Sequence, residues 1–137
     1  MIVELVPTNT IHIIWGQIEN YLKEAVKKSA GEYGIEHLKA GVVAGLQSLY
    51  VVIDESTNEI KGGVIVNFIN YPNYRVAYIT AAGGKMITTE DSWKNLAFLL
   101  KQAGATRCHA STLDSTARLY KSKLGFKKIY NTVERIL

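Results

Sequence analysis

Residues 113–126 contain the pattern that decides the fold: Leu113, then Asp114-Ser-Thr-Ala117-Arg-Leu-Tyr120-Lys-Ser-Lys-Leu124-Gly125-Phe126. Apolar side chains recur at intervals of three and four residues, which predicts a helix over 113–124 with a core face of Leu113, Ala117, Tyr120 and Leu124. Gly125 stands where a helix commonly ends in a left-handed residue. We expect residues 126–137 to follow as a strand.

Upstream of this segment, the chain alternates strands with one more helix. A helix over 89–103 has Trp93, Leu96, Ala97 and Leu100 on its apolar face, and a short strand over 106–110 follows it. Three earlier apolar runs, at 49–53, 60–69 and 74–80, are separated by polar turns and predict antiparallel strands. After the strand over 74–80, the residues Ala81-Ala-Gly83-Gly84-Lys85 are expected to form a glycine-bearing loop that leads to the helix over 89–103.

The N-terminal part begins with a strand over 2–6 that Pro7 ends. Thr8, Asn9 and Thr10 offer N-cap oxygens to a long helix, whose apolar stripe is Ile11, Ile14, Trp15, Ile18, Leu22 and Val26. A shorter helix spans 35–46. The order β-αα-βββ-α-β-α-β predicts an α/β fold in a single domain over 1–137, with a mixed, mostly antiparallel central sheet and helices on both faces.

Composition excludes several classes of protein. The chain has 137 residues, 47% of them hydrophobic, which suffices for one core without crosslinks. Its one cysteine, Cys108, excludes an internal disulfide and a multi-cysteine metal site, and we expect no metal. No apolar run is long enough for a membrane span. With no disulfide and no membrane span, we expect a cytoplasmic protein. A net charge of +4 is mild, and the lysine clusters predict a solvated face or, as the alternative, a patch for an anionic ligand or nucleic acid.

The segment from Asp114 to Phe126 resembles the GNAT (Gcn5-related N-acetyltransferase-like) superfamily. That family commonly has Asn-x-x-Ala-x-x-Leu-Tyr-x-x-Leu-Gly-Phe here, and Ala117, Leu124, Gly125 and Phe126 fall in register. The chain is also similar to small GNAT-like proteins of tailed bacteriophages. The resemblance covers the later strands and helices well, and the first helices by element order alone. It implies that the strands near 74–80 and 106–110 run parallel and diverge at their C-terminal ends.

The resemblance implies acetyl-CoA as cofactor, held by a loop of the pattern Gln/Arg-x-x-Gly-x-Gly/Ala before a helix. Here Thr80 takes the first place, Gly83 the first glycine and Lys85 the last small position. The implied cofactor-binding residues are Ile79, Thr80, Ala81, Gly83, Gly84, Lys85, Asp114 and Lys121.

This motif is degenerate, which predicts weak binding. Glu90 and Asp91 lie in the first turn of the next helix, where they compensate the positive helix end and repel a pyrophosphate, unless Lys85 and Lys94 offset them. Thr88 and Asp91 also have capping-box spacing.

Two residues are catalytic candidates. The tyrosine that donates a proton to the CoA thiolate in many family members aligns with Lys121, so Tyr120 is either a core residue or, after a local shift, the acid. His109, on the strand over 106–110, is a candidate general base or an ordinary structural histidine. Tyr71, Tyr74 and Tyr78 line an acceptor groove or a partner surface, or pack against a helix.

Two hypotheses about function follow. One is an N-acetyltransferase that moves an acetyl group from acetyl-CoA to an unidentified amine. The other is a non-catalytic GNAT-like binding or structural protein, a virion-associated or assembly component of a phage that acts in the host cytoplasm or in the particle. Either hypothesis leaves a protein partner and a homo-oligomer open.

Overall fold

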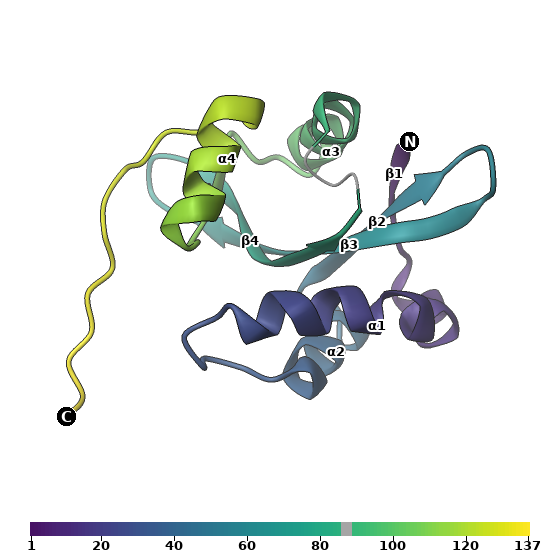
Figure 1. Cartoon of the computed structure of the whole chain (residues 1–137), viewed down its shortest axis with the longest axis horizontal. Helices are drawn as coiled ribbons and strands as arrows, with labels where there is room; N and C mark the ends of the chain where they lie inside the picture. The colour runs from purple at the N-terminus through teal and green to yellow at the C-terminus, as the bar shows by residue number, and fades with distance from the viewer. Residues whose placement is uncertain (86–88) are drawn as a thin grey trace.

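The computed structural model describes residues 1–85 and 89–137, and within them five strands form one sheet with helices on both faces (Figure 1). The elements are β1 (Ile2–Leu5), a 3-10 turn (Thr8–Thr10), α1 (Ile11–Lys27), α2 (Ile35–Val43), β2 (Ser48–Asp54), β3 (Glu59–Asn70), β4 (Arg75–Gly84), α3 (Glu90–Gln102), β5 (Arg107–Ala110) and α4 (Asp114–Leu124). The strands lie side by side in chain order. Neighbours from β1 to β4 are antiparallel, and β4 and β5 are parallel. The predicted α/β fold class is therefore confirmed.

Two apolar cores separate the sheet from its helices. Successive side chains of a strand point to opposite faces, so Leu49 and Val51 of β2 pack toward α1 and α2, while Tyr50 and Val52 pack toward α3. The predicted stripe of α1 is confirmed: its members are buried or half-buried against the first of these cores. Thr10, by contrast, makes no cap hydrogen bond to α1, and its hydroxyl donates to the carbonyl of Pro7 at 2.9 Å.

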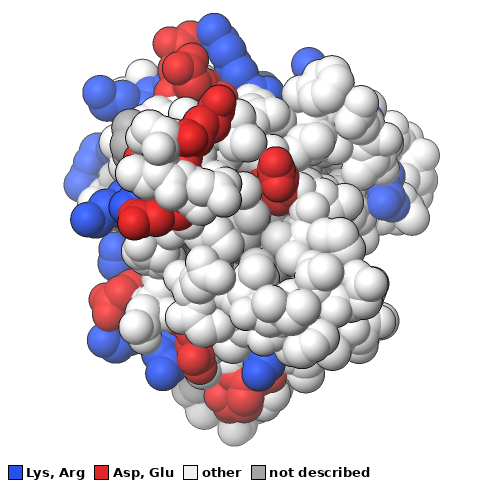
Figure 2. All heavy atoms as spheres, turned by 90° about the vertical axis from the view of Figure 1, so that its right-hand side faces the viewer, with Lys and Arg blue, Asp and Glu red and all other residues white. Residues whose placement is uncertain are grey.

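Charges on the surface are mixed. Figure 2 shows acidic and basic side chains side by side on the face that lies at the right of Figure 1, next to a broad uncharged area. In the part of the chain that the structure describes, no helix is long and apolar enough to cross a membrane.

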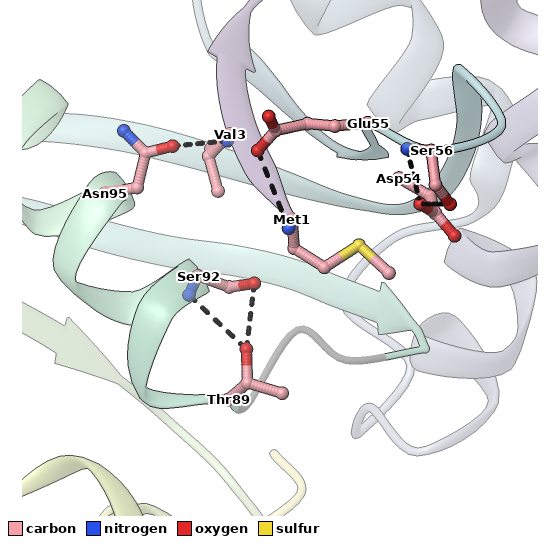
Figure 3. Close-up of polar contacts among 8 residues, drawn as sticks. All are labelled: Met1, Val3, Asp54, Glu55, Ser56, Thr89, Ser92 and Asn95. Atoms are coloured by element: carbon pink, nitrogen blue, oxygen red, sulfur yellow. Dashed lines mark hydrogen bonds and ion pairs between the residues drawn. The ribbon is translucent and has the colours of Figure 1, made fainter.

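The N-terminal strand holds α3 in place. Asn95 of α3 accepts a hydrogen bond from the backbone N–H of Val3 at 2.5 Å, and the amino group of Met1 lies 3.7 Å from a carboxylate oxygen of Glu55 (Figure 3). Both contacts fix the start of the chain against elements far along the sequence. The position of α3 on the sheet is thus set from the β1 side.

Two sequence-based boundaries are wrong. Residues 81–84, expected in a loop, belong to β4, because they pair with β3 as far as Gly62↔Gly84. Residues 126–137, all described, form no strand, and Figure 1 shows this segment running clear of the sheet after α4. A strand needs a hydrogen-bonding neighbour, and none of the described strands lies beside this segment.

The expected core face of α4 is only half covered. Tyr120 and Leu124 are half-buried, but Ala117 is exposed and Leu113 is 53% exposed. The sheet stops at β5, so no described strand lies beneath that side of the helix. Gly125 ends α4 with φ +74°, as predicted.

Candidate functional site

The centre of the candidate site is the place where β4 and β5 separate. The two parallel strands pair from Val76↔Arg107 to Ile79↔Ala110. β4 then continues to Gly84, while the chain after Ala110 turns into α4 at Asp114. The predicted parallel pairing is confirmed, and the predicted divergence at the C-terminal ends of the two strands begins after Ile79 and Ala110. Beyond this point the edge of β4 that faced β5 has no partner among the described strands.

A β-bulge coincides with this separation. The register of β3 with β4 passes from Val66↔Ile79 to Ile65↔Ala81, so Thr80 is an extra residue with no register partner on β3. The bulge reverses the alternation of β4: Ile79 packs toward α3, whereas Ala81 packs toward α1. Ile79 and Ala81, both expected to bind cofactor, are 9% and 5% exposed, and they belong to different cores.

Residues on either side of α2 hold the bulge. The hydroxyl of Tyr33 donates a hydrogen bond to the carbonyl of Thr80. The Thr80 hydroxyl donates to Oε1 of Gln47 at 2.6 Å. Burial is the main cause that raises the pKa of Tyr33, with smaller contributions from Glu32 and Tyr78, so its hydroxyl stays protonated and able to donate at neutral pH. Sequence reasoning missed Tyr33 and Gln47, which belong to no motif and approach Thr80 only in the folded chain.

An aromatic and basic strip lies on the face of β4 and β5 opposite α3. Because Cys108 packs toward α3, its neighbours Arg107 and His109 point to the other face. The ring centroids of His109 and Tyr74 are 6.2 Å apart, and the guanidinium carbon of Arg107 lies 5.0 Å from the Tyr74 centroid. Tyr71 stands edge-on to Tyr74 at 6.0 Å. The structure thus brings His109 together with two of the three tyrosines that the sequence singled out.

Tyr78, the third of these tyrosines, reaches the point of strand separation. Its hydroxyl donates to Oγ of Ser111 at 2.7 Å, just after β5 ends. Tyr78 is also the register partner of His109. This hydrogen bond joins β4 to the first residue after β5.

Tyr120 lies on the α3 side of the sheet, in an aromatic cluster. Its ring is 5.2 Å from that of Phe126, which in turn is 5.0 Å from that of Trp93. Burial is the main cause that raises the pKa of Tyr120, with a smaller contribution from Cys108. Tyr120 also lines an apolar cavity of about 20 Å³ together with Ile79, Ala82 and Leu96 among others. The cavity places the Tyr120 ring beside β4 near the bulge, on the opposite face from His109.

The glycines of the degenerate motif have packing roles. A side chain on Gly83 would collide with the backbone carbonyl of Tyr21 in α1. Gly84 has φ +118°, and a side chain there would collide with the backbone of Gly62 in β3. Both residues therefore allow the end of β4 to lie close to α1 and β3. This is a sufficient reason for two glycines, independent of any phosphate.

The start of α3 carries its own cap and its own negative charge. Thr89 is the N-cap: its hydroxyl oxygen accepts from the N–H of Ser92 at 3.3 Å (Figure 3). The predicted cap residue Thr88 lies outside the described residues. Glu90 and Asp91 occupy the first turn, and Lys94 lies 3.1 Å from Glu90, both side chains being largely exposed.

The remaining sequence-predicted residues lie at the rim. Lys85 is exposed, and its backbone N–H donates to the carbonyl of Lys61 at 2.8 Å. Asp114 and Lys121 are exposed on the first and last turns of α4. Among the described residues, no group of His, Cys, Asp and Glu side chains is arranged to hold a metal ion.

Comparison of the whole chain with solved structures finds acetyltransferases of the same fold. The ribosomal-protein-alanine N-acetyltransferase of Brucella melitensis biovar Abortus 2308 matches with a TM-score of 0.68 at 10% identity, covering 99% of this chain and 100% of that one. An aminoglycoside acetyltransferase from an uncultured soil metagenomic sample, in complex with sisomicin, matches with a TM-score of 0.64 at 17% identity, covering 98% and 95%.

A third structure contains the cofactor that the resemblance implies. A predicted acetyltransferase from Clostridium acetobutylicum, solved with acetyl-CoA, matches with a TM-score of 0.62 at 12% identity, covering 98% of this chain and 94% of that one. No protein-family model and no curated protein matches the sequence. The chain therefore has the fold of GNAT acetyltransferases.

Proposed function

We propose that this protein is an N-acetyltransferase that takes an acetyl group from acetyl-CoA and passes it to an amine. The observation that carries the proposal is the separation of β4 from β5 at the Thr80 bulge. Beyond this point the backbone edge of β4 that faced β5 is unpaired among the described strands, so an extended ligand can pair with it. The fold that the chain shares with acetyltransferases, one of them solved with acetyl-CoA, supports the same function.

The residues present fit one part of acetyl-CoA well and another part poorly. The β5-side edge of β4 beyond the bulge, from Ala81 to Gly84, would offer N–H and C=O groups to the amides of a pantetheine arm, whereas the Thr80 carbonyl already accepts from Tyr33. The start of α3 suits a pyrophosphate poorly, because Thr89 already caps it and Glu90 and Asp91 compensate its dipole. We therefore expect binding that is real but weak, with a dissociation constant of about 0.1 mM or higher.

The acceptor would approach from the face that carries His109. This face also carries the rings of Tyr71 and Tyr74 and the hydroxyl of Tyr78. Aromatic faces attract a protonated amine. A protonated amine would first give up one proton to solvent. The neutral amine would then attack the acetyl carbon of the thioester that acetyl-CoA supplies, and His109 would accept the second proton that the nitrogen loses as the amide forms. Tyr120, which lines the small cavity beside β4, would donate a proton to the leaving thiolate from the other side of the strands.

The binding step is the sharpest test of this function. Acetyl-CoA is titrated calorimetrically into the pure protein, and acetyl transfer to a polyamine, a peptide N-terminus and an aminoglycoside is then measured. Weak saturable binding with transfer to at least one amine supports the proposal. Absence of both binding and transfer at millimolar ligand overturns it.

The second candidate is a non-catalytic member of the fold that acts as a binding or assembly component, as in a phage particle. The observation that favours it is the charge at the α3 N-terminus, where Glu90 and Asp91 take the place of a phosphate. The aromatic cluster of Trp93, Tyr120 and Phe126 fills space between α3 and α4 in the same region. This candidate predicts a stable fold with neither acetyl-CoA binding nor transfer.

A further inference from the structure

The sheet ends in an open edge at β5. Among the described strands β5 pairs with β4 alone, so its other side presents unpaired backbone N–H and C=O groups. Such an edge is a template for another strand, and proteins usually cover or blunt it. β5 is short, spanning Arg107–Ala110, but no proline blocks its edge.

The segment that follows α4 has a sequence typical of a strand, but in the structure it pairs with no described strand. Residues 127–137, Lys-Lys-Ile-Tyr-Asn-Thr-Val-Glu-Arg-Ile-Leu, are rich in β-branched and aromatic side chains and contain no glycine or proline. Every one of them is exposed. The apolar members reach exposures that a folded domain rarely leaves uncovered: Ile129 52%, Tyr130 71%, Val133 89% and Ile136 81%.

The side of α4 above the β5 edge is uncovered as well. Leu113 and Ala117 belong to the same helical stripe as the half-buried Tyr120 and Leu124, yet both are exposed. A further strand beside β5 would lie under this part of α4. One added strand beside β5 would therefore cover the open edge, the uncovered stripe and the exposed segment together.

We propose that the segment 127–137 of one chain adds as a strand to the β5 edge of a second copy, and that the exchange is reciprocal. Phe126 is fixed against Trp93 and Tyr120, so the segment starts from a defined point. From there it leads away from its own domain (Figure 1). Two copies related by a twofold axis would each fill the other's edge, and exchange of an identical element creates a dimer at low cost.

The test compares the mass of the full chain in solution with that of two variants. Light scattering after size exclusion, from about 1 µM to about 100 µM protein, should give a dimer for the full chain. A chain ending at Phe126 should give about half that mass. Val133→Pro should do the same, because proline removes an N–H that strand pairing uses, whereas Val133→Thr keeps a β-branched residue and should remain dimeric. Since Val133 is exposed, neither substitution threatens the domain itself.

Hydrogen exchange of the same samples distinguishes the remaining outcomes. Protected amides in 127–137 of the full-length dimer, lost with Val133→Pro, support the exchange. A monomer with protected amides there would mean that the segment pairs with its own β5, and a monomer with unprotected amides would mean that it pairs with nothing. A dimer that survives truncation would place the interface elsewhere. Each of these three results overturns the proposal.

Discussion

The hydroxyl of Tyr33 donates a hydrogen bond to the backbone carbonyl of Thr80, and so joins the segment before α2 to the bulge where β4 leaves β5. The contact crosses 47 positions of the sequence. It makes the geometry of the gap depend on a residue outside the sheet.

Removing this hydroxyl should weaken the fold and loosen the bulge. Tyr33→Phe leaves the Thr80 carbonyl without that donor, and we expect the free energy of unfolding to fall by about 1–2 kcal/mol. The measurement is urea denaturation followed by circular dichroism. Tyr71→Phe, which removes a hydroxyl from a residue 48% exposed, is the matched control and should leave the midpoint nearly unchanged. Equal midpoints for Tyr33→Phe and the unmodified protein would contradict the assigned contact.

Gly83 should tolerate no side chain. Gly83→Ala places a methyl group against the backbone carbonyl of Tyr21, so α1 must shift, at a cost of at least about 2 kcal/mol in unfolding free energy. Gly16 is the control: it lies within α1, a Cβ added there would meet no atom within 4 Å, and Gly16→Ala should stabilise the protein by about 0.5–1 kcal/mol. Thermal melts of both variants check the opposite signs. A harmless Gly83→Ala would mean that the glycine is kept for another reason.

Neutralising the start of α3 should tighten acetyl-CoA binding. Glu90→Gln combined with Asp91→Asn removes two negative charges from the first turn, and we expect an affinity gain of about 3- to 10-fold by calorimetry. Lys85→Ala should weaken binding, because it removes a positive charge close to the same end. Glu24→Gln, on the distant helix α1, serves as the charge control. Micromolar affinity of the unmodified protein would show that Glu90 and Asp91 do not oppose the ligand.

The thiol of Cys108 should be nearly inert in the folded protein. Burial raises its pKa to about 12, so at pH 8 only about one thiol in ten thousand is ionised, and alkylation by iodoacetamide should be very slow. Unfolding in guanidinium should restore the ordinary rate. Because the folded pKa lies above the unfolded one, this group leaves stability unchanged below about pH 8.5 and lowers it as the pH rises from there toward 12. Rapid labelling of the native protein at pH 8 would contradict this burial.

Trp93 should contribute to the α3–α4 contact less than a fully buried tryptophan would. It is half-buried and packs on Phe126 at 5.0 Å, so Trp93→Ala should cost less than the 3–5 kcal/mol typical of large core truncations, at about 2–3 kcal/mol. Chemical denaturation measures it. Phe98→Ala, on the same helix but 57% exposed, is the control. An unchanged midpoint for Trp93→Ala would mean that this face of α3 does not pack on α4.

The parts of the fold that the sequence predicted depend on local patterns. The stripe of α1 from Ile11 to Leu22 follows from helical periodicity, and the left-handed Gly125 follows from its place after Leu124. The prediction of a final strand over 126–137 was wrong because a strand needs a hydrogen-bonding partner, and a local sequence pattern does not indicate whether a partner lies beside it. For the same reason the start of β4 was recognised, but not its continuation to Gly84 along β3.

The candidate site was predicted in part. His109 and the tyrosines at 71, 74 and 78 were singled out by residue type and strand spacing, and the structure places His109 beside Tyr74. Thr80 was aligned with a motif position, but its role as a bulge residue depends on the register with Ile65 and Val66. Tyr33 and Gln47 come from irregular segments, where neither periodicity nor composition indicates which distant atom a side chain will meet.

The arrangement of strands in chain order has a consequence for how the protein folds. Each strand from β2 to β5 can join an edge that the preceding strand has just provided, so the sheet can grow in one direction while the chain is being synthesised. The hydrogen bond from Val3 to Asn95 spans 92 positions and can form only after α3 has been made. Closing such a long loop is slow relative to pairing neighbours. Docking of α3 on β1 therefore has to wait until the sheet from β1 to β4 has been made, although β1 is the first strand of the chain.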